Sequence, residues 1–159
     1  MADLIFREAR ESDLPRVVAM LADDPLGAKR ERTEDPLPDV YREALAEIQA
    51  LPGCQVIVAE RDGQVVGCLQ ITVIPNLSYQ GSRRAIVEGV RIDRSYRGQG
   101  LGEALFRYTI DLAWQAGCRL VQLTADRTRA DAHRFYERLG FEPTHLGMKL
   151  DLESAPKPN

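Results

Sequence analysis

The residues best suited to chemistry lie in a basic, glycine-rich turn, Arg97-Gly98-Gln99-Gly100-Leu101-Gly102-Glu103, between a β-branched stretch and an amphipathic one. Glycines let the backbone turn tightly and leave its amides uncovered. The first amides of the following helix have no intrahelical partner and lie at the positive end of its dipole. Beside a fixed arginine charge, such amides predict a phosphate site, although a glycine-rich helix start without a ligand remains an alternative.

The spacing of the turn narrows the choice of ligand. A P-loop would need a Lys-Ser or Lys-Thr pair after the last glycine, and a dinucleotide fingerprint would need a glycine where Glu103 stands. The pattern that matches is Arg-x-x-Gly-x-Gly, formed by Arg97, Gly100 and Gly102. This pattern resembles the acetyl-CoA pyrophosphate loop of the GNAT N-acetyltransferase superfamily.

A second motif carries the same resemblance. The segment Ala132-His133-Arg134-Phe135-Tyr136-Glu137-Arg138-Leu139-Gly140-Phe141 is similar to the closing Ala-x-x-Phe/Leu-Tyr-x-x-x-Gly-Phe segment of that superfamily. Two motifs in the right order are much more specific than one.

The elements expected around these motifs follow from hydrophobic periodicity. Asp62-Gly63 is a strong hairpin signal between two of the strands. The expected strands are 4–7, 55–60, 65–74, 85–92, 120–124 and 141–152, and the expected helices are about 13–22, 39–51, 100–116 and 129–139.

These elements predict an α/β (α+β) fold with the order β-α-α-β-β-β-α-β-α-β. Hairpin strands precede a βαβ-like half, so the sheet should be mixed, mostly antiparallel and flanked by helices. This order resembles the GNAT acyl-CoA N-acyltransferase fold. We expect one N-acetyltransferase domain over residues 1–152 and a flexible tail over 153–159, which contains two prolines.

The composition is that of an ordinary globular protein. The chain has 159 residues, of which 44% are hydrophobic and 28% charged, and a net charge of -3, which argues against a dedicated nucleic-acid binder. It shows neither a membrane-spanning run nor a signal-peptide pattern. The three cysteines, scattered without a CxxC spacing, predict reduced side chains, a cytoplasmic location and no metal site.

The resemblance implies that acetyl-CoA is the co-substrate. Its pantetheine arm would pair with the main chain of the strand before the turn, as an extra strand can at an open sheet edge. Its pyrophosphate would be held by Arg97 and the amides that follow. The implied contacts are Val90, Arg91 and Ile92 on the strand and Arg97, Gly98, Gln99, Gly100, Leu101, Gly102 and Glu103 in the turn.

Acetyl transfer to an amine also needs a base, an acid and an oxyanion donor. Glu88, a carboxylate on an otherwise apolar strand, matches the base of many family members, and a structural ion pair is the alternative. Tyr136 matches the family tyrosine that protonates the leaving thiolate, although an aromatic at helical spacing can also simply pack. Gly89 would help the strand bulge and expose an amide near Val90 to the oxyanion.

The chain departs from the family pattern at Arg129, where many relatives carry an asparagine seven residues before the tyrosine. The arginine could reach a cofactor phosphate or be solvated. His133, on the same helix, is expected at the surface rather than in catalysis.

The sequence therefore predicts an N-acetyltransferase that moves acetyl directly to an amine of a small molecule or peptide. The alternatives are a non-catalytic acyl-CoA-binding module and an enzyme with another acyl group or acceptor atom. The acceptor is expected among residues 23–41 and 76–84, with Tyr41, Tyr79, Arg83 and Arg84 as lining candidates. No nucleic-acid or membrane partner is expected; a homodimer is common for this fold, but no residue here demonstrates one.

Overall fold

The computed structural model describes residues 3–158. The chain divides into two compact units, Met1–Leu123 and Thr124–Asn159. Met1, Ala2 and Asn159, which belong to the expected domain and tail, lie outside the described residues. The first unit holds the sheet and most of the helices, and the second holds the last helix.

The first unit is built on a five-stranded sheet of order β1-β2-β3-β4-β5. Neighbouring strands from β1 to β4 are antiparallel, whereas β4 and β5 are parallel, so the expected mixed and mostly antiparallel sheet is confirmed. The strands are β1 (Leu4–Glu8), β2 (Cys54–Arg61), β3 (Gln64–Ile74), β4 (Arg83–Ile92) and β5 (Cys118–Leu123).

The turn between β2 and β3 shows how local chemistry sets register. It consists of Asp62 and Gly63 alone, with φ angles of 50° and 76°. Positive φ at both central positions is what a two-residue hairpin turn of type I′ requires, and Asp-Gly meets that requirement at low cost. The predicted hairpin is confirmed.

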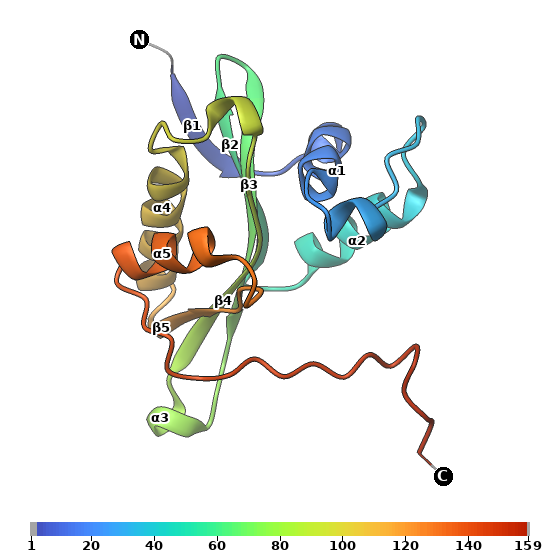
Figure 1. Ribbon diagram of the computed structural model, residues 1–159. Coiled ribbons are helices and arrows are strands. Elements are labelled where there is room, and N and C mark those ends of the chain that lie inside the picture. The colour runs from blue at the N-terminus through green and yellow to red at the C-terminus, as the bar shows by residue number, and fades with distance from the viewer. Residues whose placement is uncertain (1–2, 159) are drawn as a thin grey trace. The chain divides into compact units, whose positions relative to one another are not determined.

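Helices cover both faces of this sheet (Figure 1). Helices α1 (Leu14–Ala22) and α2 (Asp39–Ala50) lie on one face, and α4 (Leu101–Gln115) lies on the other. The short elements are η1 (Glu11–Asp13), η2 (Gly27–Lys29), η3 (Arg94–Tyr96) and α3 (Ser78–Gly81), a single turn in which Tyr79 and Gln80 have positive φ. Among the described residues, none of the helices is long and apolar enough to cross a membrane.

Each face has its own core. On the α1 and α2 side, Leu14, Val17 and Leu45 pack with Val58 and Cys68 of the sheet. On the α4 side the largest buried side chain is Phe106, and its neighbour Leu105 is also fully buried. The amphipathic stripes of the sequence therefore face the sheet, as their 3.6-residue period predicts.

The second unit contains α5 (Ala130–Arg138), which matches the last expected helix. The strand expected over 141–152 is wrong, because residues 141–158 form no strand in the described part of the chain. Leu146, Met148, Leu150 and Leu152 do alternate as a strand would, but they are 75–93% exposed. Period-two alternation predicts a strand only where a paired strand supplies hydrogen bonds, and the sheet ends at β5.

Candidate functional site

The glycine-rich turn connects β4 to α4 through η3. Gly98 and Gly100 have φ angles of 74° and 77°, a conformation that other residues adopt only with strain. Gly100 is the N-cap of α4, and the amide of Ala104 donates to its carbonyl at 3.0 Å. The amides of Leu101, Gly102 and Glu103 therefore precede the helical hydrogen bonds and lie at the positive end of the helix dipole.

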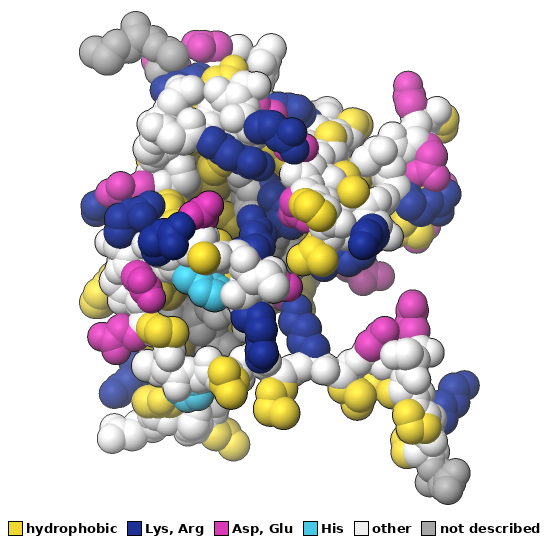
Figure 2. All heavy atoms as spheres, viewed as in Figure 1, with side chains coloured by type: hydrophobic (Ala, Val, Ile, Leu, Met, Phe, Trp, Pro, Cys, Tyr) yellow, Lys and Arg dark blue, Asp and Glu magenta, His cyan; other side chains and the backbone are white. Residues whose placement is uncertain are grey.

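The surface of this turn is basic. Figure 2 shows Lys and Arg side chains gathered around the segment that follows β4. Arg97 is half exposed, and its Nε donates to the carbonyl of Ile92 at 3.1 Å. Arg61 donates to Gln99 at 2.9 Å, and Arg94 pairs with Asp23 at 2.7 Å. Arginines therefore hold the turn in place and make its surface basic.

Asp93 begins the turn, and the charge of its carboxylate is balanced by an arginine. It accepts from the amide of Ser95 at 2.9 Å and pairs with Arg16 of α1. Burial would raise the pKa of Asp93, but the Ser95 amide and the Arg16 guanidinium outweigh it and lower that pKa. The carboxylate stays ionised and fixes the turn to α1.

The strand before the turn is irregular where the sequence predicts a bulge. Cys68 of β3 lies opposite Arg91 and Gln70 lies opposite Glu88, so Leu69 alone faces Gly89 and Val90. Gly89 has a φ of 62°. This is a β-bulge in β4, and it redirects the main chain beside Val90.

The same part of β4 has an open edge on its β5 side. The parallel pairing of β4 with β5 ends at Val87 and Leu123, so Glu88 to Ile92 have no β5 partner among the described residues. Val90, Arg91 and Ile92, the predicted pantetheine contacts, lie on this edge. Two carbonyls there accept from arginines, Val90 from the Arg91 side chain at 2.8 Å and Ile92 from Arg97.

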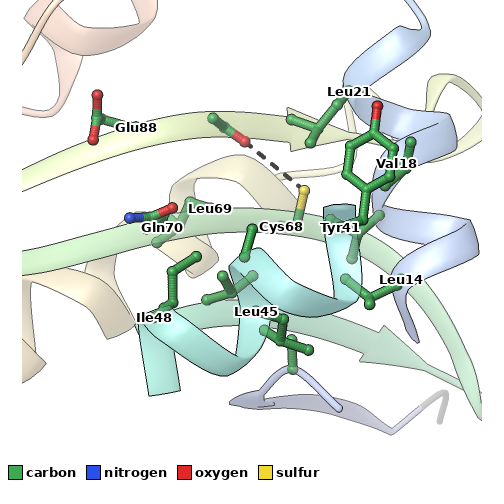
Figure 3. A pocket seen from close by; sticks show the side chains of 15 residues that line it. Leu14, Val18, Leu21, Tyr41, Leu45, Ile48, Cys68, Leu69, Gln70 and Glu88 are labelled. Atoms are coloured by element: carbon green, nitrogen blue, oxygen red, sulfur yellow. Dashed lines mark hydrogen bonds between the residues drawn. The ribbon is translucent and has the colours of Figure 1, made fainter. Parts of the chain in front are cut away.

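A cavity of about 310 Å³ lies beside the bulge, between the helices α1 and α2 and the sheet. Figure 3 shows Glu88 and Gln70 toward one end of it and Tyr41 and Leu14 toward the other. Its lining comes from five elements and the residue after β1: Ala9, Leu14, Val17, Val18, Leu21, Tyr41, Ala44, Leu45, Ile48, Val56, Cys68, Leu69, Gln70, Glu88 and Gly89.

Glu88 reaches this cavity from β4. Because it is the cross-strand partner of Gln70, both side chains lie on the sheet face that α1 and α2 cover. Gln70 is held by Cys54, to whose Sγ it donates at 3.4 Å. Glu88 is exposed, so solvent can reach its carboxylate.

Cys68 lies in the wall of the cavity and is 1% exposed. Its Sγ donates to the carbonyl of Gly89 at 3.8 Å. Burial raises the pKa of this thiol to about 12, with Arg91 opposing the shift. The thiol is therefore neutral at physiological pH, which makes it a poor nucleophile.

Two other predicted site residues belong to the second unit. Tyr136 is half-buried in α5, with ring centroids 5.3 Å from Phe135 and 6.0 Å from Phe141. Arg129 is the exposed N-cap of α5. His133 lies on the same helix, where its Nε2 hydrogen-bonds with the carbonyl of Asp126 at 2.9 Å. Their roles remain predictions.

The structure thus brings together the predicted residues of β4, the turn and the start of α4, with Glu88 at the mouth of a cavity. Of the acceptor candidates, Tyr41 lines the cavity, whereas Tyr79, Arg83 and Arg84 are not among its lining residues. Sequence reasoning missed Gln70, whose only signal is a polar amide side chain within a strand that is mostly apolar. Among residues 3–158, no three His, Cys, Asp or Glu side chains gather as a metal site.

Comparison with known proteins adds the family. The sequence profile of the Acetyltransferase (GNAT) family matches residues 15–141. The chain belongs to this family. Its enzymes are acyltransferases, and relatives of this chain are named N-acetyltransferases.

Two curated relatives match over nearly their whole length. A glucosamine 6-phosphate N-acetyltransferase of Trypanosoma brucei brucei is 30% identical over 96% of this chain and 98% of its own. The L-amino acid N-acetyltransferase AaaT of Escherichia coli is 28% identical over 98% of this chain and 93% of its own. A crystal structure described as a transcriptional regulator from Bacillus halodurans C-125 is 49% identical, with a TM-score of 0.91 over 94% of this chain and all of that one. The GNAT fold is confirmed.

Proposed function

We propose that the protein transfers an acetyl group from acetyl-CoA to a primary amine by direct transfer, using Glu88 as the base. The observation that carries this proposal is the bulge at Gly89. It brings three features together on β4: an exposed carboxylate at the mouth of a cavity, an irregular main chain, and an open sheet edge that leads into the glycine turn.

The residues of the first unit suit acetyl-CoA. The open edge from Val90 to Ile92 offers main-chain groups to the amides of a pantetheine arm. The turn from Arg97 to Glu103 offers unpaired amides, a helix dipole and an arginine to a pyrophosphate. We therefore assign cofactor binding to Val90, Arg91, Ile92, Arg97, Gly98, Gln99, Gly100, Leu101, Gly102 and Glu103, and a further phosphate contact to Arg129.

The proposed chemistry follows from these positions. Acetyl-CoA supplies the acetyl thioester. Glu88, directly or through a water, accepts the proton that the amine loses as its nitrogen bonds to the carbonyl carbon. An amide near Val90 donates to the carbonyl oxygen, and Tyr136 donates a proton to the sulfur as the carbon–sulfur bond breaks. The buried neutral thiol of Cys68 favours direct transfer over a covalent enzyme intermediate.

Calorimetric titration with acetyl-CoA tests the binding step without knowledge of the acceptor. We expect micromolar binding of acetyl-CoA, no binding of NAD, and loss of acetyl-CoA binding on Arg97→Ala. Absence of binding to the folded protein would overturn the assignment of the turn. Binding without turnover on any amine would indicate the acyl-CoA-binding module, and a panel of acyl-CoA thioesters would reveal another preferred acyl group.

Tyr136→Phe tests the acid. Removing the hydroxyl should lower kcat by about 10- to 100-fold, since a positioned general acid contributes about that much or more. The acetyl-CoA dissociation constant should stay within about twofold, because the ring that packs with Phe135 and Phe141 is retained. An unchanged kcat would remove Tyr136 from the mechanism.

Several predictions from the sequence remain proposals. These are a single N-acetyltransferase domain over residues 1–152 with a tail over 153–159, a cytoplasmic location, and the absence of a metal and of nucleic-acid or membrane partners. A homodimer is a further proposal of the same kind.

A further inference from the structure

The cavity beside Glu88 carries chemical information about the acceptor. Its lining contains one charged residue, Glu88, at one end, and no lysine or arginine. We propose that the acceptor is a small primary amine with an uncharged, apolar body, such as an alkylamine or an arylalkylamine. This inference rests on the proposed function, because it assigns the cavity to the amine that Glu88 deprotonates.

The polar side chains that line the cavity either lie at the Glu88 end or already have hydrogen-bond partners. The Tyr41 hydroxyl donates to Glu31 at 2.9 Å and accepts from the amide of Arg32 at 2.8 Å. Gln70 stands opposite Glu88, at the same end. The far end, toward Leu14, is thus walled by aliphatic side chains and an aromatic ring, so a ligand can bury carbon there without losing hydrogen bonds.

Two arginines close to the cavity in sequence, Arg91 and Arg16, are already paired. Arg91, two residues beyond Gly89, pairs with Asp24 at 2.9 Å and donates to the carbonyl of Val90. Arg16 of α1 pairs with Asp93 and donates to the carbonyl of Val65 at 3.1 Å. A phosphate or carboxylate in the cavity would therefore lose its hydration without gaining either of these two cations, which is costly.

The size and charge of the cavity point the same way. About 310 Å³ lies at the small end of ligand sites, which span roughly 300–1,000 Å³. An amine that arrives protonated is attracted to the exposed Glu88 carboxylate, and its body then extends between α1 and α2. It releases its extra proton through Glu88 to water before its nitrogen attacks the thioester. The lining thus favours a different acceptor from the phosphorylated sugar in the name of the Trypanosoma brucei relative.

A homologous series of amines tests this assignment. With saturating acetyl-CoA, kcat/KM should rise about fourfold for each methylene from propylamine to hexylamine, the gain expected per buried methylene. Hexylamine should exceed its matched partner 6-aminohexanoate, and also glucosamine 6-phosphate, by about 100-fold or more. Equal rates along the series, or a preference for either anionic amine, would overturn the inference while leaving acetyl transfer in place.

A matched pair of variants on α2 locates the effect. Ala44 lines the cavity, whereas Ala46, two residues later on the same helix, does not, and both are exposed. Ala44→Phe should fill the cavity and reverse the preference for hexylamine over propylamine, and Ala46→Phe should leave that preference unchanged. Acetyl-CoA binding, measured by calorimetry, should be the same in both variants. Equal chain-length profiles in the two variants would show that the cavity is a packing gap only.

The binding of amines separates this inference from the proposed function. If no amine is acetylated although acetyl-CoA binds, calorimetric titration of the acetyl-CoA complex with hexylamine and with 6-aminohexanoate measures the cavity directly. Binding of hexylamine alone, lost in Ala44→Phe, would support the apolar site although catalysis failed. No binding of hexylamine would overturn the apolar site.

Discussion

The glycine turn and the cavity differ in how the sequence specifies them. The turn is one continuous segment, Arg97 to Glu103, whose amides, charge and φ angles follow from neighbouring residues. The cavity is assembled from separate elements and is apolar except for the end at Glu88. A local segment can be shared by many enzymes with one co-substrate, while an assembled wall can change residue by residue. We therefore expect substitutions in the two regions to separate co-substrate binding from acceptor chemistry.

Glu88→Gln should separate acceptor chemistry from acetyl-CoA binding most strongly. Without a carboxylate to take the amine proton, kcat/KM for the amine should fall by about 100- to 10,000-fold at neutral pH. Acetyl-CoA affinity should be unchanged, because the turn and the open edge of β4 are intact. Rates from pH 6 to 10 and calorimetric binding of acetyl-CoA provide the two measurements.

Glu47→Gln is the matched control for this change. Glu47 is an exposed glutamate of α2 outside the cavity lining, so its variant should keep the wild-type rate. If Glu88→Gln also kept that rate, Glu88 would be a structural carboxylate, and the cavity would lose its link to the base.

Substitution of Gly100, where φ is 77°, should have a smaller effect, which weakens acetyl-CoA binding and leaves the amine preference unchanged. A Cβ there would meet nothing within 4 Å, so Gly100→Ala acts through backbone strain of about 1–2 kcal/mol and through crowding of the ligand side of the turn. The acetyl-CoA dissociation constant should rise about tenfold, equivalent to roughly 1.4 kcal/mol. The chain-length preference for amines should stay as in the wild type.

Gly117 offers an unusually close control. It follows α4 with a φ of 74°, and a Cβ there also meets nothing within 4 Å. In urea titrations, Gly117→Ala should therefore lower the free energy of unfolding by about as much as Gly100→Ala does, while acetyl-CoA affinity stays at the wild-type value. Equal weakening of acetyl-CoA binding in both variants would mean that the turn contributes only stability.

The contrast between the regions also explains what the sequence could predict. The hairpin at Asp62-Gly63, the bulge at Gly89 and the helix start at Gly100 were predictable because each depends on a glycine and its immediate neighbours. The cavity was not, because the role of Gln70 depends on its register with Glu88, which only the folded sheet defines.

The strand expected over 141–152 failed for the same reason. Its alternation is local, but a strand also needs an edge to pair with, and sequence periodicity does not supply one. Glu88 was predictable as a conspicuous carboxylate on an apolar strand. The cavity that Glu88 lines could not be predicted from the sequence.

The smallest effect tests how the wall of the cavity is anchored. At the start of α1, the two carboxylate oxygens of Asp13 accept from Arg7 at 2.7 and 3.0 Å, and one also accepts from the Arg10 amide at 2.7 Å. Hydrogen bonding from Arg7, aided by the Arg10 amide, lowers the pKa of Asp13 although burial opposes the shift. Asp13→Asn should therefore lower the free energy of unfolding by about 1–2 kcal/mol at pH 7.

The pH dependence of that loss identifies its cause. Because the folded pKa of Asp13 lies below the unfolded value of about 3.9, its contribution is fully present above that value and is lost as the pH falls through the folded pKa. In urea titrations, the difference between wild type and Asp13→Asn should be constant from pH 7 to about 5 and shrink below about 4. A difference that stayed constant down to pH 3 would assign the loss to packing instead of charge. In either case acetyl-CoA affinity at pH 7 should not change. Asp13 anchors the α1 wall of the cavity, and its partners are Arg7 and Arg10, which lie outside the glycine turn.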